Sequence, residues 1–174
     1  MRKFSVRELV LSAMVAAVYT VLTVFLPIPQ YQQVQFRIAE CMTVLPFLFP
    51  WAGPGLVAGC FLANLLGSPF VLDWVFGTLA TALACLLTAG MPNKWLTPLP
   101  PVLCNAVIVG GEIAFSTVGG FGGSFLSAWW AFGLSVGLGE LAVCYLLGLP
   151  LLVSLSRIKV FRGLMPEKRL SSIS

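Results

Sequence analysis

Charged and amide side chains are few in this chain of 174 residues, and several of them stand inside apolar stretches. Polar groups at such positions are costly in a bilayer and usually mark a function. A carboxylate can accept paired N–H donors, an amide or guanidinium can bind a carbonyl, and a tryptophan ring can stack on a flat ligand. The ligand-binding candidates of these types are Gln35, Arg37, Glu40, Asn64, Asp73, Trp74, Asn105, Glu112, Trp129 and Trp130.

Several of these candidates also have a purely structural explanation, which we keep open. Arg37 and Glu40 are three residues apart, so on one helix they could neutralise each other. Asn64 could bond a neighbouring helix, and Asp73 could favour the N-terminus of its own helix. Tryptophan and tyrosine also gather at membrane interfaces for reasons unrelated to a ligand.

Glu112 is harder to explain by local pairing. The apolar stretch that contains it, residues 98–115, has no Lys or Arg. Asn105 lies seven residues earlier, which places both side chains on one face of a helix. We therefore predict that this polar stripe faces a ligand. Glu140, in the last apolar stretch, is instead expected to be a buried hydrogen-bonded group or part of a docking face.

The composition excludes several other classes of protein. Hydrophobic residues make up 59% of the chain and charged residues 9%, too few to cover a water-soluble domain. There is no histidine, which removes imidazole catalysis and His-based metal sites, and the five cysteines are scattered without a CxxC pair. The net charge of +4 is small, so we expect no nucleic-acid partner. The missing histidine and cysteine pairs lead us to expect no metal, and we expect no cofactor.

The apolar stretches predict an all-α membrane protein with six transmembrane helices, because one membrane helix needs about 20 apolar residues. The second stretch is short: Phe36 to Phe49 would make about 21 Å of helix, less than a hydrocarbon core of about 30 Å. It predicts either a helix that begins within the membrane or a loop that dips inward against protein or a cavity. The expected spans are residues 8–26, 36–49, 55–67, 73–89, 98–115 and 125–153.

The positive charges predict the orientation. With six spans and both termini cytoplasmic, every Lys and Arg except Arg37 lies on the cytoplasmic side. Residues 1–156 then form the membrane domain, and residues 157–174 form a basic cytoplasmic tail that anchors at an anionic membrane surface. On this topology the polar candidates from four spans converge on the outer third of the bilayer. We predict a polar pocket that opens to the outside and is closed below by apolar packing.

Small residues mark the first span. Ser12 and Ala16 form one small-xxx-small pair, and Ala13 and Ala17 form a second. Small residues at this spacing let another helix approach closely.

Three segments resemble a known family. Gln35-Phe-Arg-Ile-Ala-Glu40 with Thr43-Val-Leu-Pro46, then Gly59-Cys-Phe-Leu-Ala-Asn64, then Asp73-Trp-Val-Phe-Gly-Thr-Leu-Ala-Thr81 are similar to the signature regions of QueT-type S-components. These proteins are the substrate-binding membrane subunits of energy-coupling factor (ECF) transporters assigned to queuosine precursors. The resemblance runs from the first span to about Glu112.

The resemblance implies a multi-pass protein of a prokaryotic plasma membrane that captures its substrate at the outer face. The loop of residues 27–34, which includes Tyr31, would act as a lid. The loaded protein would dock through Ala13 and Ala17 on a transmembrane coupling subunit and topple toward the cytoplasm. Two partner ATPase subunits would supply the energy, since the chain has no GxxxxGK[ST] motif and is not expected to be an enzyme.

The implied substrate is a 7-deazaguanine base such as preQ1 or preQ0, and the candidate residues suit it. Such a base presents adjacent N–H donors, a carbonyl and a flat ring, while an aminomethyl group adds a cation. The sequence does not assign one role to each carboxylate. An S-component for another vitamin or purine and a structural membrane subunit without a ligand remain the alternatives, and an intramembrane enzyme is the least favoured.

Overall fold

The computed structural model describes residues 5–26, 36–166 and 169, and within them every regular element is a helix. The all-α prediction is therefore confirmed for the described residues. The elements in chain order are α1 (Val6–Phe25), η1 (Ile38–Phe47), α2 (Ala52–Gly67), α3 (Val71–Ala89), η2 (Lys94–Leu96), α4 (Leu99–Cys104), η3 (Asn105–Val109), α5 (Gly110–Val118), α6 (Phe125–Val143), η4 (Cys144–Gly148), α7 (Leu149–Arg157) and α8 (Lys159–Arg162).

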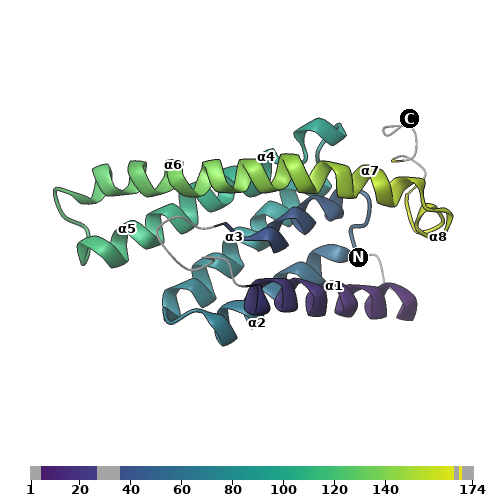
Figure 1. The fold of residues 1–174 in the computed structure, drawn as a ribbon, viewed down its shortest axis with the longest axis horizontal. Coiled ribbons are helices and arrows are strands. Elements are labelled where there is room, and N and C mark those ends of the chain that lie inside the picture. The colour runs from purple at the N-terminus through teal and green to yellow at the C-terminus, as the bar shows by residue number, and fades with distance from the viewer. Residues whose placement is uncertain (1–4, 27–35, 167–168, 170–174) are drawn as a thin grey trace.

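Four helices in the described part of the chain are long and apolar enough to cross a membrane. They are α1, α3, the continuous rod Lys94–Val118 and the continuous rod Phe125–Arg157. The other two predicted spans are the shorter apolar helices η1 and α2. The rods Lys94–Val118 and Phe125–Arg157 lie side by side, whereas α1 packs on α2 and η1. The start of α1 and the end of α7 lie toward the same end of the bundle (Figure 1).

The short second span is the centre of the bundle. η1 is a 3₁₀ helix, and every residue from Ala39 to Phe47 is buried. It packs against α1, α2, α3 and α7, so protein surrounds it on all sides. Ten residues at a 3₁₀ rise of about 2.0 Å cover only about 20 Å. The element is therefore too short to cross a bilayer and instead forms the core around which the long helices pack.

Two glycines let α1 approach α2 closely. A Cβ atom at Gly55 would lie 2.2 Å from the Ser12 carbonyl oxygen, and one at Gly59 would lie 2.7 Å from that of Ala16. Ser12 and Ala16 are accordingly buried in this contact. Ala13 and Ala17, on another face of α1, are exposed. The two small-residue pairs of this span therefore have different surroundings.

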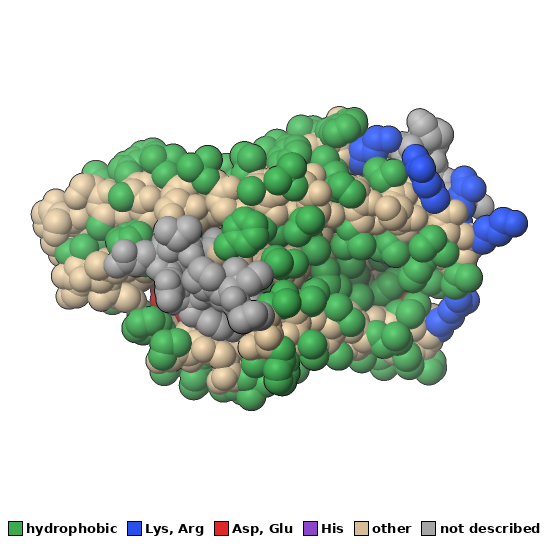
Figure 2. Space-filling view, viewed as in Figure 1, with side chains coloured by type: hydrophobic (Ala, Val, Ile, Leu, Met, Phe, Trp, Pro, Cys, Tyr) green, Lys and Arg blue, Asp and Glu red, His purple; other side chains and the backbone are tan. Residues whose placement is uncertain are grey.

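The end of the molecule that holds α7 and α8 is basic outside and aromatic inside. Lys and Arg side chains gather there in Figure 2, as the charge distribution of the sequence predicts. Inside, Phe49 packs against Trp51 and Phe161. Arg169 of the basic tail donates hydrogen bonds of 2.6 Å to the carbonyls of Met91 and Ala89. This tail residue is therefore docked on the end of α3.

Candidate functional site

Glu40 lies deep inside the bundle, where it is hydrogen-bonded to Tyr19, a residue that was not among the predicted site residues. Its side chain is 1% exposed, and the Tyr19 hydroxyl donates a hydrogen bond to Oε1. Oε2 has no hydrogen-bond partner among the described residues. Tyr19 belongs to the buried face of α1 that also carries Ser12, Ala16 and Thr23. That i, i+4, i+7 spacing of polar and small residues was the signal available in the sequence.

Arg37, just before η1, is 6% exposed and interacts electrostatically with Glu40 and with Asp73. Its guanidinium reaches α3 at Gly77. A Cβ atom built there would lie 4.0 Å from Arg37 Nη1 and 2.8 Å from Asn64 Nδ2. Arg37 and Asn64 therefore meet over this glycine, which leaves room for both side chains.

Asn64 and Asp73 join the end of α2 to the start of α3. Asn64 Nδ2 donates to the Asp73 carbonyl at 2.9 Å, while Asn64 Oδ1 has no partner among the described residues. The Asp73 carboxylate accepts a hydrogen bond from the Ser68 hydroxyl and lies in the first turn of α3. The structural explanations for both residues therefore apply, yet an amide oxygen is still left open.

Glu112 reaches the same group from α5. It is 6% exposed and interacts with Asp73 and with Arg37. Its Oε2 atom has no hydrogen-bond partner in the described part of the chain. The structure thus brings five of the predicted residues together. We call Tyr19, Arg37, Glu40, Asn64, Asp73 and Glu112 the outer cluster, after the side of the membrane on which the topology predicted from the sequence places the polar candidates.

Asn105 has a different partner. Its Nδ2 atom donates to Glu140 Oε1 at 2.6 Å. The π-helical segment η3 begins at Asn105 and separates it from Glu112. A π turn inserts an extra residue, which rotates the following residues by about 100° relative to an α-helix. The stripe predicted to join Asn105 and Glu112 on one face is therefore divided.

Glu140 is the centre of a second buried group, as expected for a hydrogen-bonded carboxylate. Besides Asn105, it accepts a contact of 3.5 Å from Cys144 Sγ. The Thr43 hydroxyl donates to the Glu40 carbonyl oxygen, which is also the alternative acceptor for the single S–H of Cys144. We call Asn105, Glu140, Cys144 and Thr43 the inner network.

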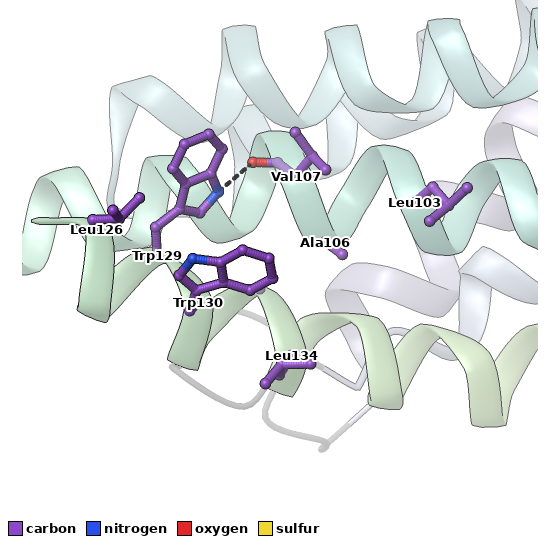
Figure 3. Close-up of a pocket in the computed structure, with 8 residues that line it drawn as sticks. Leu103, Ala106, Val107, Leu126, Trp129, Trp130 and Leu134 are labelled. Carbon is purple, nitrogen blue, oxygen red and sulfur yellow. Dashed lines mark hydrogen bonds between the residues drawn. The ribbon is translucent and has the colours of Figure 1, made fainter.

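The predicted tryptophans lie apart from these groups. Trp129 Nε1 donates to the Val107 carbonyl at 2.9 Å, and Trp129 and Trp130 line an apolar groove of about 420 Å³ with Leu126 and Leu134 (Figure 3). None of the described residues that line this groove is charged. Trp74 is half-buried, and its Nε1 atom has no partner among the described residues. A ligand contact for these three rings stays a prediction.

A cleft between α3 and α5 was not anticipated from the sequence. It has a volume of about 510 Å³, and Glu112 is the only charged residue among the described residues that line it. Its walls are the apolar residues Leu72, Phe76, Leu79, Ile108, Phe115, Phe121 and Phe125, with Gly111. The aromatic residues come from α3, α5, α6 and the loop between α5 and α6, so their meeting could not be deduced from spacing.

Two predicted residues cannot be placed. Gln35 and the lid residue Tyr31 lie outside the described residues. Within the described ranges no group of three or more Cys, Asp or Glu residues could hold a metal ion. The five cysteines are free thiols, and four of them are buried.

The apolar helices together with a buried charged cluster define a multi-pass α-helical membrane protein. A family model described as QueT transporter matches residues 9–157. The chain therefore belongs to the QueT transporter family, as the sequence motifs indicated, and its role is transport rather than catalysis. No curated protein and no solved structure matches the chain.

Proposed function

We propose that this protein is the substrate-binding S-component of an ECF transporter and that it binds a queuosine precursor at the outer cluster. The observation that carries the proposal is the set of open acceptors there. Glu40 Oε2, Asn64 Oδ1 and Glu112 Oε2 are buried without partners among the described residues. Buried polar atoms in folded proteins are nearly always satisfied, so unpaired atoms in one group call for an absent ligand.

The chemistry of a 7-deazaguanine base complements this group. Its adjacent ring and exocyclic N–H groups would donate to a carboxylate, and Glu40 is already oriented for this by Tyr19. Its carbonyl would accept from Arg37, the cationic donor of the cluster. Gln35, Asn105, Trp74, Trp129 and Trp130 remain predicted ligand contacts. The match to the QueT transporter family supports a transport role, and the substrate class is what the resemblance to QueT-type S-components implies.

The proposed topology has six membrane segments, with both termini in the cytoplasm of a prokaryotic cell. The gathering of Lys and Arg at the end that holds α7 and α8 supports this orientation (Figure 2). The cluster then lies on the outer side, where the loop of residues 27–34 would close over a bound substrate. η1 and α2 would complete the six as short segments supported by their neighbours.

The proposed partners are a transmembrane coupling subunit and two ATPase subunits. Ala13 and Ala17 are exposed on α1 and would admit a helix of the coupling subunit at close range. Ala13→Leu with Ala17→Leu should abolish substrate uptake by the assembled transporter while leaving substrate binding intact. Val18→Leu, at another exposed position of α1, is the matched control and should retain uptake.

The direct test is ligand binding by the purified chain. A ligand that binds only the folded state must raise the melting temperature. We expect preQ1, the aminomethyl 7-deazaguanine base, to do so selectively and saturably, with guanine, adenine and thiamine as controls. A shift with thiamine or adenine alone would identify an S-component for another nutrient. No shift with any compound would favour a structural subunit and contradict the proposal.

A further inference from the structure

The outer cluster holds more acidic than basic groups. Glu40, Asp73 and Glu112 meet a single guanidinium, that of Arg37. No other Lys or Arg occurs in the sequence between Arg7 and Lys94, or between Lys94 and Arg157. The segment of residues 27–35 therefore adds no positive charge. Since buried carboxylates are costly without opposite charge, this composition favours a ligand that is itself a cation.

The three carboxylates differ in how they are held. Glu40 accepts from the Tyr19 hydroxyl, and Asp73 accepts from the Ser68 hydroxyl. Glu40 and Glu112 each keep one buried oxygen without a described partner, but of the three carboxylates only Glu112 is among the described residues that line the cleft between α3 and α5. It is therefore the carboxylate best placed to meet a new charged group.

The rest of the cleft also suits a cation. Phe115 and Phe121 have ring centroids 5.0 Å apart, and Phe121 and Phe125 are 4.9 Å apart. Phe76 adds a further ring from α3. Aromatic faces attract ammonium groups, most strongly where water is excluded. A volume of about 510 Å³ is sufficient for part of a small ligand.

We propose that this cleft is a subsite for an ammonium group, with Glu112 as its counter-ion and the phenylalanine rings as its walls. The site thereby selects a cationic aromatic base over a neutral base of the same shape. This inference rests on the proposed function, because it assumes that a substrate occupies the outer cluster. It adds that Glu112 is the residue that distinguishes a charged base from a neutral one.

The test compares two bases that share one ring system and differ in charge. The aminomethyl base preQ1 carries an alkylamine that, like lysine, is protonated at neutral pH, whereas the nitrile base preQ0 is uncharged there. Calorimetric titration of the full chain in nanodiscs should show at least tenfold tighter binding of preQ1. In Glu112→Gln the preference should fall to threefold or less, chiefly through weaker binding of preQ1. Phe115→Leu, which removes a ring and keeps an apolar side chain, should reduce the preference partially.

Glu140→Gln is the matched control, because Glu140 is an equally buried carboxylate bonded to Asn105 and does not line the cleft. It should keep the wild-type preference. Equal binding of both bases by the wild type, or an unchanged preference in a folded Glu112→Gln protein, would overturn the inference while the proposed function stands.

If neither base binds, the proposed function fails, and a simpler pair of probes still decides the subsite. Benzylamine should raise the melting temperature of the wild type but not that of Glu112→Gln, and neutral benzonitrile should affect neither protein. A lack of any difference between benzylamine and benzonitrile would overturn the subsite as well.

Discussion

The outer cluster and the inner network are both buried polar groups in one helical bundle, but their hydrogen bonds are satisfied to different degrees. In the inner network the Glu140 carboxylate contacts Asn105 through one oxygen and Cys144 through the other. In the outer cluster, Glu40 and Glu112 each have an oxygen without a described partner. Buried polar networks stabilise a fold when they are complete, whereas an incomplete one costs free energy. The inner network therefore fixes helices, whereas the open acceptors of the outer cluster are the basis for the proposed ligand site.

The largest effect, on the free energy of unfolding, should come from removing the Glu140 carboxylate from the inner network. Glu140→Ala leaves the buried Asn105 amide without its acceptor and should lower the free energy of unfolding by about 3 kcal/mol. Denaturant or thermal unfolding in detergent measures this change. Glu140→Gln keeps an acceptor for Asn105 and should recover most of the loss. Wild-type stability in Glu140→Ala would remove the distinction between the two groups.

Neutralising a carboxylate of the outer cluster should have the opposite pattern, with a loss of substrate affinity and no loss of stability. Glu40→Gln preserves shape and an acceptor for Tyr19, but it removes the charge offered to the substrate. We expect substrate affinity to fall by about 2 kcal/mol, or roughly thirtyfold, as for a hydrogen bond to a charged group. The melting temperature without ligand should stay equal or rise, since a buried charge is removed. Titration calorimetry with a parallel melting curve checks both; a fall in stability without a loss of affinity would make Glu40 structural.

The positioning of Glu40 predicts a smaller effect. Tyr19→Phe removes the hydroxyl that donates to Oε1 while keeping the buried ring. Substrate affinity should decrease by about 1 kcal/mol, or roughly fivefold. Tyr145→Phe is the control, because the Tyr145 hydroxyl donates to the Trp95 carbonyl away from the cluster. Unchanged affinity in Tyr19→Phe would show that Glu40 needs no support from α1.

The smallest effect concerns the apolar groove. Trp130 is 69% exposed and lies with Trp129 among uncharged residues. If the outer cluster holds the substrate, Trp130→Ala should change affinity by less than about 0.5 kcal/mol, the usual range for an exposed position. A loss of tenfold or more in a binding titration would extend the site to this groove, as the sequence analysis predicted.

Much of the site could be predicted because charged groups are rare in an apolar chain. Arg37, Glu40, Asn64, Asp73 and Glu112 were selected by their cost in a bilayer alone, and the structure brings them together. Tyr19 was missed because a single tyrosine changes hydropathy little. Asn105 was grouped with Glu112 because a regular helix was assumed, and the π turn at η3 altered that register.

The number of membrane-crossing helices shows a similar limit. Stretch lengths predicted six spans, of which only the second was doubtful, whereas the structure has two short elements, η1 and α2. Hydropathy could not predict that η1 is a buried 3₁₀ core helix, because burial by protein and burial by lipid both favour apolar residues.

The sequence by itself determined that most of this protein lies in a membrane, that it is helical, which family it belongs to and which residue types are available to a substrate. Those follow from composition and local pattern, which depend on each residue and its near neighbours. The tertiary structure alone decided which acceptors remain open, which small residues of α1 are buried, and that Glu112 lines an aromatic cleft. These depend on helices far apart in the chain, whose rotation and close approach are set by packing across the whole bundle.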